Sequence, residues 1–390
     1  MKFTVNNGEL SLFLAGRVDS VSAPAVEAEI EKIRSETAHT SVTLDADDLE
    51  YISSAGLRIV LRLRKNEPTL RVINASAEVY EIFEMTGFIE MIPVEKGYRK
   101  LSVEGCESIG KGANGEVFRL DPDTIIKVYL NPDSLPDIKR ERDLARRAFV
   151  LGVPTAIPYD VVKVGAGYGS VFELLNAKSL ATLIAENPDK LDEYVGIYVD
   201  LMKKIHSTEV RPEDMPDMKE VGVNWAKFLL PYLPEKTGAK LVSLVEGIRD
   251  DNHMLHGDYH IKNVMIQNGE ALLIDMDTLC HGHRVFELAS MFNAYVGFLE
   301  LDHDMANRFL GVPYETCLAI WEKTLHLYLG TTDPAEIAAV EKRAMVIGYT
   351  RLMRREIRRG ALDTEQGRAK TEYYKSKIIA LVDEVDTLDF

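Results

Sequence analysis

The sequence predicts an α/β domain at the N-terminus, followed by a larger region of the α+β class. Strand and helix patterns alternate over the first hundred residues, which is typical of a small α/β domain. Beyond a short polar segment at 95–100, strand-like runs surround a glycine-rich turn, and helical patterns dominate from Ser179 onward. We therefore expect domains at 1–97, 101–178 and 179–390.

The elements of the first domain follow from its hydrophobic periods. Leu10, Leu12 and Leu14 recur at every second position after an Asn7-Gly8 turn, which predicts a hairpin. Helices are expected where apolar residues recur every three to four positions. The expected strands are Phe3–Val5, Leu10–Ala15, Ser41–Asp45, Leu70–Ile73 and Phe88–Val94, and the expected helices start near Ser22 and cover Gly56–Lys65 and Ala77–Thr86.

Composition excludes several classes of protein. With 46% hydrophobic residues among 390, the chain can bury substantial cores, so a disordered or low-complexity protein is excluded. A net charge of −16 argues against a nucleic-acid partner. Three scattered cysteines cannot build a disulfide framework, and we see neither a signal peptide nor a membrane-spanning run. We expect a cytoplasmic protein that does not bind membranes.

Residues 110–117 carry three glycines at GxGxxG spacing. Gly110, Gly112 and Gly115 are followed by Val117, and such a turn lets backbone N–H groups approach phosphate oxygens. No Lys-Ser/Thr pair follows the last glycine, which excludes a Walker A motif. A strand pattern rather than a helix follows, which disfavours a dinucleotide fold. A flexible hairpin turn without ligand remains the alternative.

Lys127 stands inside an apolar strand pattern at 125–129. A buried ammonium is costly unless it is paired, so this lysine is expected to contact a carboxylate and a phosphate. Glu141, in a charged helical pattern from about Ile138 to Val150, is the best candidate partner.

The strongest motif is His-Gly-Asp-Tyr-His-Ile-Lys-Asn at 256–263, followed by an apolar run that ends in Asp275. Asp258 precedes Asn263 by five positions. Together these residues supply what phosphoryl transfer requires, namely a carboxylate to accept a hydroxyl proton and oxygen ligands for Mg²⁺.

This HGDxHxxN…IDxD pattern resembles the aminoglycoside phosphotransferase and choline kinase superfamily, relatives of protein kinases, over about residues 101–390. The resemblance implies a bilobal kinase-like fold that uses ATP and Mg²⁺. By that resemblance the catalytic residues are Asp258 as base, Lys127 on the phosphates and Glu141 as its ion-pair partner; the metal ligands are Asn263 and Asp275; and the nucleotide site includes Gly110, Gly112, Gly115, Val117, Lys127 and a hinge with Glu173 and Leu175.

A second resemblance covers about residues 1–97. The segment Tyr-Ile-Ser-Ser-Ala-Gly-Leu at 51–57 resembles the STAS domain of bacterial anti-sigma-factor antagonists, whose phosphorylatable serine lies in a similar D-S-S-G-L segment. By that resemblance Ser54 is a regulatory phosphosite, with Ser53 in place of the usual aspartate. The alternative is that both serines simply cap the following helix.

Three functions remain open at this point. The first is a phosphotransferase acting on the hydroxyl of a small molecule, with a STAS domain that regulates it or docks it to a protein partner. A cationic acceptor would suit the acidic charge, which falls mostly beyond residue 100. The second is a protein serine kinase, with Ser54 itself as a candidate target. The third is a non-catalytic nucleotide-binding protein.

Weaker signals have ordinary alternatives. A Cys-His-Gly-His run at 280–283 could hold a metal but suits a loop equally. Five arginines between 351 and 359 form a basic stripe at helical spacing, either a solvated face or a site for an acidic partner or phosphate. The role of Asp277 is open, and three aromatic residues could line a pocket or belong to the core: Trp225, Tyr295 and Trp321.

Overall fold

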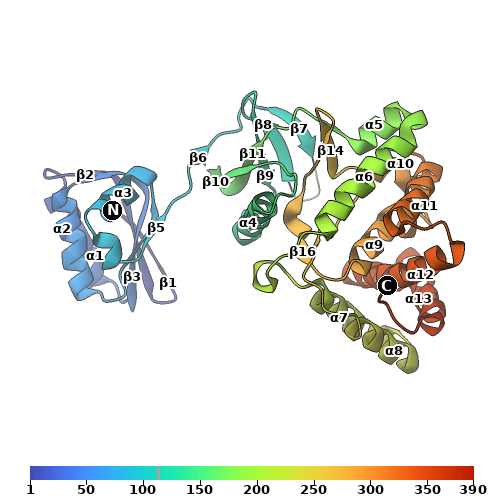
Figure 1. The fold of residues 1–390 in the computed structure, drawn as a ribbon. Coiled ribbons are helices and arrows are strands. Elements are labelled where there is room, and N and C mark those ends of the chain that lie inside the picture. Colours follow the sequence, from blue (N-terminus) through green and yellow to red (C-terminus); the bar gives the residue numbers. More distant parts are fainter. Residues whose placement is uncertain (112–114) are drawn as a thin grey trace. The chain divides into compact units, whose positions relative to one another are not determined.

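The computed structural model describes residues 1–111 and 115–390 (Figure 1). The chain divides into two compact units. The first comprises Met1–Gly105, Val128–Pro132 and Val161–Gly169, and the second comprises Cys106–Lys127, Asp133–Asp160 and Ser170–Phe390. Within the described ranges, no helix is both long enough and apolar enough to cross a membrane.

A five-stranded sheet with the order β1-β2-β3-β4-β5 forms the centre of the first unit. The first two strands pair antiparallel and the other neighbours pair parallel. Leu10, Leu12 and Leu14 are buried, which confirms the predicted alternation. The elements are β1 Lys2–Asn6, β2 Glu9–Val18, α1 Ala23–Glu36, β3 Ser41–Ile52, α2 Ser54–Asn66, β4 Arg71–Ala75, α3 Ala77–Met85, η1 Phe88–Glu90 and β5 Val94–Lys96.

The strand predicted at Phe88–Val94 is wrong. Gly87 adopts a left-handed conformation with φ 72°, Phe88–Glu90 form a 3-10 turn, and β5 begins only at Val94. The ring of Phe88 lies 6.0 Å from that of Phe83 on α3 in an edge-on arrangement. These apolar residues therefore pack against a helix instead of alternating across a sheet.

The third strand is longer than predicted. It continues past Asp45 to Ile52, and Leu49 and Ile52 on the added part are buried. Its pairing with β2 contains two register shifts between Phe13 and Arg17. A register shift changes which side chains face the core, so the strand does not keep a strict period of two along its length. The period-two pattern therefore did not predict the added part of the strand.

The two serines at the start of α2 have different roles. Ser53 is the N-cap, and its hydroxyl accepts a hydrogen bond from the Ala55 N–H at 3.2 Å. Ser54 is the first helical residue and is exposed. A Cβ on Gly56 would lie 2.6 Å from a side-chain carbon of Ile52, so glycine lets the helix start pack closely on the sheet. The interpretation that both serines cap the helix is therefore wrong for Ser54.

We predict that Ser53→Ala destabilises α2 by about 1 kcal/mol, the usual cost of losing a side-chain cap. Hydrogen exchange of the α2 amides in the full-length protein measures this change. Ser54→Ala is the matched control and should leave exchange within about 0.5 kcal/mol of wild type, because its hydroxyl does not cap. Equal protection in all three proteins would contradict the assignment of the cap.

The remaining strands form three sheets. Their orders are β6-β10-β11-β9-β8-β7, β12-β14-β15 and β13-β16. The predicted strand around Lys127 and the strand after the glycine-rich turn are confirmed as β9 and β8. The strands are β6 Lys100–Leu101, β7 Glu107–Lys111, β8 Gly115–Arg119, β9 Thr124–Tyr129, β10 Pro158–Val164, β11 Gly167–Glu173, β12 Lys178–Ser179, β13 Met254–Leu255, β14 Val264–Gln267, β15 Glu270–Leu273 and β16 Cys280–His281.

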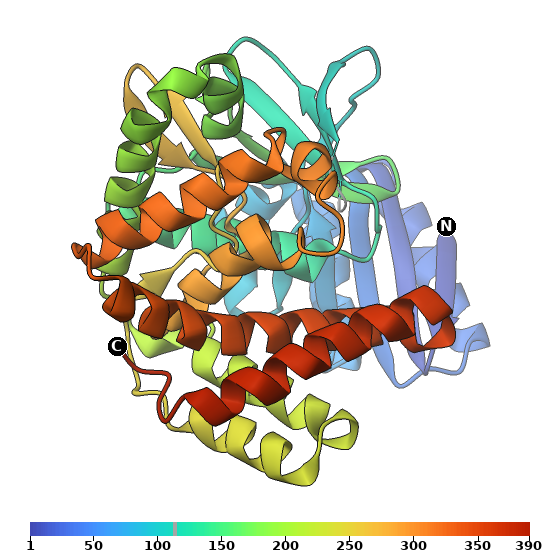
Figure 2. The same ribbon diagram turned by 90° about the vertical axis from the view of Figure 1, so that its right-hand side faces the viewer.

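Helices build most of the second unit. The long helix α12 packs against α13, α9 and α7, and Figure 2 shows α12 and α13 side by side in red. One continuous apolar core runs through these helices. The helices are α4 Leu135–Val150, α5 Leu180–Glu186, α6 Leu191–His206, α7 Met218–Leu229, α8 Glu235–Glu246, α9 Val285–Phe292, α10 Met305–Leu310, α11 Tyr314–Leu329, α12 Pro334–Arg358 and α13 Glu365–Glu384, with a π-helical turn at Asn293–Gly297 and short 3-10 turns at 188–190, 212–214, 230–232, 276–278 and 361–363.

Candidate active site

Lys127 links three elements of the second unit. From β9, its Nζ lies 3.0 Å from Glu141 Oε1 on α4 and 3.1 Å from Asp275 Oδ1 after β15. Burial alone would lower the pKa of Lys127, but the two carboxylates raise it to about 12. The predicted Lys127–Glu141 ion pair is therefore present, and the structure adds Asp275 to it.

Asp275 occupies a constrained position. It has a left-handed backbone with φ 64°, unusual for a residue other than glycine, and its side chain is 43% exposed. Burial and the nearby carboxylates of Asp275 and Glu141 raise the pKa of Asp277 to about 7, although Lys127 opposes them. Because Lys127 brings one positive charge to the carboxylates of Glu141, Asp275 and Asp277, this group keeps an excess of negative charge.

The side chains of Asn263 and Asp275 fit a Mg²⁺ ion. Asn263 donates its Nδ2–H to the Asp258 carbonyl at 3.0 Å, which leaves its Oδ1 as an acceptor. Amide and carboxylate oxygens are ligands that Mg²⁺ prefers, and a divalent cation would offset the excess charge near Asp275. In the described part of the chain, no three His, Cys, Asp or Glu side chains form a metal-binding group, so the Cys-His-Gly-His run does not form one.

His256 and Gly257 fix the backbone of the loop that carries Asp258. His256 Nδ1 accepts the Asp258 N–H at 3.3 Å, so its Nε2 carries the proton and donates to the Ile274 carbonyl at 3.2 Å. Gly257 has φ 80°, and a Cβ there would lie 2.4 Å from the Thr278 carbonyl. Glycine is required at this position because the backbone of Thr278 passes too close for a side chain.

The side chain of Asp258 stays ionised. Burial would raise its pKa, but His260, Arg351 and His256 together lower it to about 2. His260 Nε2 lies 3.5 Å from Asp258 Oδ2. The carboxylate is therefore available as a hydrogen-bond acceptor at neutral pH.

Glu287 on α9 holds the start of this loop. Its carboxylate is fully buried and accepts the N–H groups of His256 at 2.6 Å and Gly257 at 3.0 Å. His206 Nε2 lies 3.5 Å away, and despite burial His206 and His256 keep the pKa of Glu287 below its usual value. Glu287 therefore positions the start of the loop.

Three buried tyrosines hold the other end of the loop. Tyr198 and Tyr259 each donate a hydroxyl hydrogen bond to the other's backbone carbonyl, at 3.0 and 2.6 Å. Tyr295 accepts the N–H of Ile261 at 3.0 Å and donates to the Tyr198 hydroxyl at 3.0 Å. The loop backbone is thus fixed by side chains from α6 and from the turn after α9.

The predicted nucleotide-site residues lie on β7, β8 and β11. Gly110 on β7 is opposite Val117 on β8, and Gly115 begins β8, so the two strands form the expected hairpin. Gly112 lies outside the described residues. Glu173 ends β11 and its carboxylate accepts the Ile157 N–H at 3.3 Å, with Leu175 two residues further on. The roles of these residues stay predictions.

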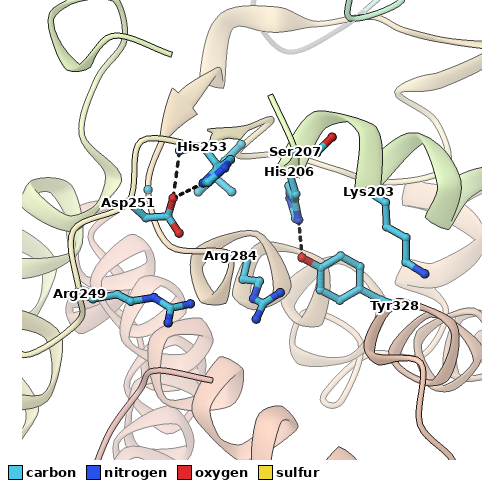
Figure 3. A pocket seen from close by; sticks show the side chains of 10 residues that line it. Lys203, His206, Ser207, Arg249, Asp251, His253, Arg284 and Tyr328 are labelled. Carbon is cyan, nitrogen blue, oxygen red and sulfur yellow. Dashed lines mark hydrogen bonds and ion pairs between the residues drawn. The ribbon is translucent and has the colours of Figure 1, made fainter. Parts of the chain in front are cut away.

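A pocket of about 380 Å³ is lined by His206, which lies next to Glu287, and by Tyr328 (Figure 3). Figure 3 shows His206 and Tyr328 pointing toward each other, with His206 Nδ1 2.7 Å from the Tyr328 hydroxyl. Lys203, Arg249 and Arg284 also line this pocket. Through His206, its wall is part of the support for the Asp258 loop.

Sequence patterns missed the residues that support the loop. His206 and Tyr198 lie in an amphipathic helical segment, where they look like ordinary core residues, and no local motif marks them. The sequence marks Tyr295 only as an aromatic residue of a pocket or of the core, and not as support for the loop. Tyr295, Trp321 and Trp225 all lie in the core, and Trp225 also lines a pocket. The arginine stripe gave a signal, and Arg351 from that stripe contacts the loop at the Gly257 carbonyl.

These elements define a two-part protein, an α/β domain followed by a kinase-like bilobal fold. The chain belongs to the phosphotransferase enzyme family (APH), whose model matches residues 105–316, and it carries a STAS domain, whose model matches residues 1–101. Over 100 residues it is 38% identical to BtrV of Bordetella bronchiseptica strain RB50, whose name assigns it as an anti-sigma factor antagonist. That match covers 24% of this chain and 85% of BtrV.

Solved structures with a similar fold match this chain at low sequence identity. A thermostable mutant of aminoglycoside phosphotransferase APH(4)-Ia, in a ternary complex with ADP and hygromycin B, is 12% identical with a TM-score of 0.49, over 79% of this chain and 98% of that one. A choline/ethanolamine kinase family protein from Mesorhizobium loti is 14% identical with a TM-score of 0.47, over 71% and 88%.

Proposed function

We propose that this chain is an ATP- and Mg²⁺-dependent phosphotransferase that moves the γ-phosphate to a hydroxyl of a small molecule. Its STAS domain regulates it or docks it to a protein partner. The observation that carries the proposal is the Lys127 ammonium held between Glu141 and Asp275, because it joins a phosphate-binding cation to a metal-ligand candidate.

Each residue has one task in this proposal. Asp258 accepts a hydrogen bond from the acceptor hydroxyl and takes its proton late in the transfer, since its low pKa makes it a weak base in the ground state. Lys127 binds nucleotide phosphate oxygens, and Glu141 orients it. Asn263 and Asp275 would hold Mg²⁺, which when bound neutralises charge on the phosphate oxygens.

The test is ADP release by the full-length protein with Mg-ATP and a panel of hydroxyl compounds. Family membership and the aminoglycoside and choline/ethanolamine kinase names of similar structures place kanamycin, hygromycin B, choline and sugar alcohols in the panel. Acceptor-dependent ADP release supports the proposal. Mg-ATP binding without release by any acceptor or by self-phosphorylation would favour the non-catalytic alternative.

The second candidate, self-phosphorylation at Ser54, has a specific observation in its favour. Ser54 is exposed at the first turn of α2, while Ser53 supplies the cap, so phosphate can be added to Ser54 without removing the capping bond. Intact-protein mass spectrometry after incubation with Mg-ATP tests this. A gain of about 80 Da that disappears in both Ser54→Ala and Asp258→Asn would favour it over a small-molecule acceptor.

We predict that Lys127→Ala lowers the affinity for Mg-ATP by roughly tenfold or more, because a charge-assisted contact to phosphate is lost and two carboxylates are left facing it. Isothermal titration with Mg-AMP-PNP measures the change. Lys178→Ala, which removes an exposed pair with Glu186, is the control and should bind as wild type does. Unchanged affinity in Lys127→Ala would remove its phosphate-binding role.

A further inference from the structure

A second pocket, of about 410 Å³, lies among the helices of the second unit and is lined almost entirely by cations. Its lining residues are Trp225, Arg351, Arg354, Arg355, Arg358 and Arg359. Trp225 is on α7 and the arginines are at the C-terminal end of α12, two helices that pack together (Figure 1). Spacings of three and four residues bring the guanidinium groups to one side of α12.

The charge of this pocket is not balanced by acids. Within residues 1–111 and 115–390, no carboxylate forms an ion pair with Arg351, Arg354, Arg358 or Arg359. Arg355 lies 3.7 Å from Glu356, a carboxylate that it shares with Lys370 at 3.3 Å. The arginines of this cluster repel one another, and a bound anion would offset that repulsion.

Aromatic rings hold three of the guanidinium groups in place. Arg351 lies 5.5 Å from the Trp225 ring, Arg354 lies 5.7 Å from Phe228, and Arg355 lies 4.6 Å from Phe298. Such stacking fixes the plane of a guanidinium without neutralising it. Burial, together with repulsion from neighbouring arginines, lowers the pKa values of Arg354 and Arg355, as expected for crowded cations.

The pocket adjoins the loop of the candidate active site. Arg351 Nη1 donates to the Gly257 carbonyl at 3.2 Å and to Ser290 Oγ at 2.9 Å. Gly257 immediately precedes Asp258, and Arg351 is one of the charges that keep Asp258 ionised. The Arg351 end of the pocket is therefore in direct contact with the Asp258 loop.

The cations of the Figure 3 pocket do not offer the same site. Lys203 Nζ donates to the Leu327 carbonyl at 2.7 Å, and Arg249 and Arg284 donate to the Phe390 carbonyl at 3.3 and 3.1 Å. Each of these three cations thus donates a hydrogen bond to a backbone carbonyl near the pocket. The pocket on α12, in contrast, combines a cluster of five arginines with a contact from Arg351 to the Asp258 loop.

We propose that the pocket lined by Trp225 and the α12 arginines binds an anionic group, a phosphate or a carboxylate, of the acceptor molecule whose hydroxyl faces Asp258. This inference rests on the proposed function. Guanidinium groups bind both anions through paired N–H donors, and the cluster would repel the cationic amine that the overall charge suggested.

The first test measures binding of inorganic phosphate and citrate to the full-length protein. It uses wild-type protein saturated with Mg-AMP-PNP and, separately, the Lys127→Ala variant. In both samples the nucleotide site then contributes little to anion binding. Replacing the two exposed arginines, in Arg358→Gln/Arg359→Gln, is expected to weaken binding roughly tenfold or more. Arg343→Gln, also on α12 but outside the pocket, is the matched control. Equal affinity in the double variant, or an equal loss in the control, would overturn the proposal.

The second test compares acceptors in matched pairs, glycerol with glycerol 3-phosphate and glucosamine with glucosamine 6-phosphate. The anionic member is expected to release ADP faster, and the double variant should raise its KM roughly tenfold with kcat nearly retained. Preference for the uncharged or cationic member would overturn the proposal. So would binding of polyglutamate through these arginines with no binding of phosphate or citrate, which would indicate an acidic protein partner.

The two proposals fail in different ways. Arginine-dependent binding of phosphate or citrate by a protein that never turns over ATP would count against phosphotransfer and leave an anion site. Acceptor-dependent turnover that is indifferent to Arg358 and Arg359 would leave phosphotransfer intact and remove the anion site.

Discussion

Asp258→Asn is expected to lower kcat for acceptor-dependent ADP release by about 10²–10⁴-fold, the range usual for removing a general base. Asparagine keeps the size of the side chain and the backbone N–H that His256 accepts, but it cannot take a proton. Mg-ATP affinity should stay within about threefold of wild type, because Asp258 is not among the groups that pair with Lys127.

The control for this substitution is Asp250→Asn, an aspartate with an 88% exposed side chain that pairs with Lys219 in the same unit. It should turn over as wild type does. Full activity in Asp258→Asn would show that proton removal depends on another group and would end the assignment of Asp258 as base.

Glu287→Ala is expected to reduce the free energy of unfolding of the second unit by about 3–5 kcal/mol, as for removal of one partner of a buried charged network. The substitution leaves the N–H groups of His256 and Gly257 buried without their acceptor. Urea unfolding, together with hydrogen exchange of residues 254–264, separates a local effect from a global one. Exchange in this loop should rise most.

The sign of the pH dependence follows from the lowered pKa of Glu287. Its stabilisation is present above the unfolded pKa of a glutamate and is lost as pH falls through the lower folded-state pKa. The alanine variant should lack this acid-side loss. Glu384→Ala, which removes an exposed pair with Lys342, is the control and should cost less than about 1 kcal/mol.

Contiguous motifs made the centre of the candidate site predictable. Spacing grouped Asp258, Asn263 and Asp275 as residues for phosphoryl transfer. The cost of burial predicted a carboxylate partner for Lys127, and the helical pattern selected Glu141, which lies 3.0 Å from it in the structure. Most strands and helices were also predicted, since Leu10 to Leu14 and the helix at 56–65 show clear periods. The family and the fold class were both indicated by these motifs.

What lies outside the motifs could not be predicted, because it depends on long-range packing. His206 and Tyr198 support a loop about fifty to sixty residues away, and nothing in their own helix indicates it. The apolar pattern that begins at Phe88 predicted a strand. In the structure the preceding glycine turns the chain, and Phe88 packs against the ring of Phe83 on α3. The arginine stripe was visible, but its pocket requires Trp225 from another helix.

The exchange of phenol hydrogen bonds between Tyr198 and Tyr259 has a consequence for sequence variation. A phenylalanine at either position would keep the ring and its stacking but would remove a buried hydrogen bond to a backbone carbonyl. A substitution that is conservative on any hydrophobicity scale is therefore not neutral here. Among natural or laboratory variants of this chain, tolerance at these sites should be governed by the hydroxyl group, and a phenylalanine should persist only where a second change supplies a new donor.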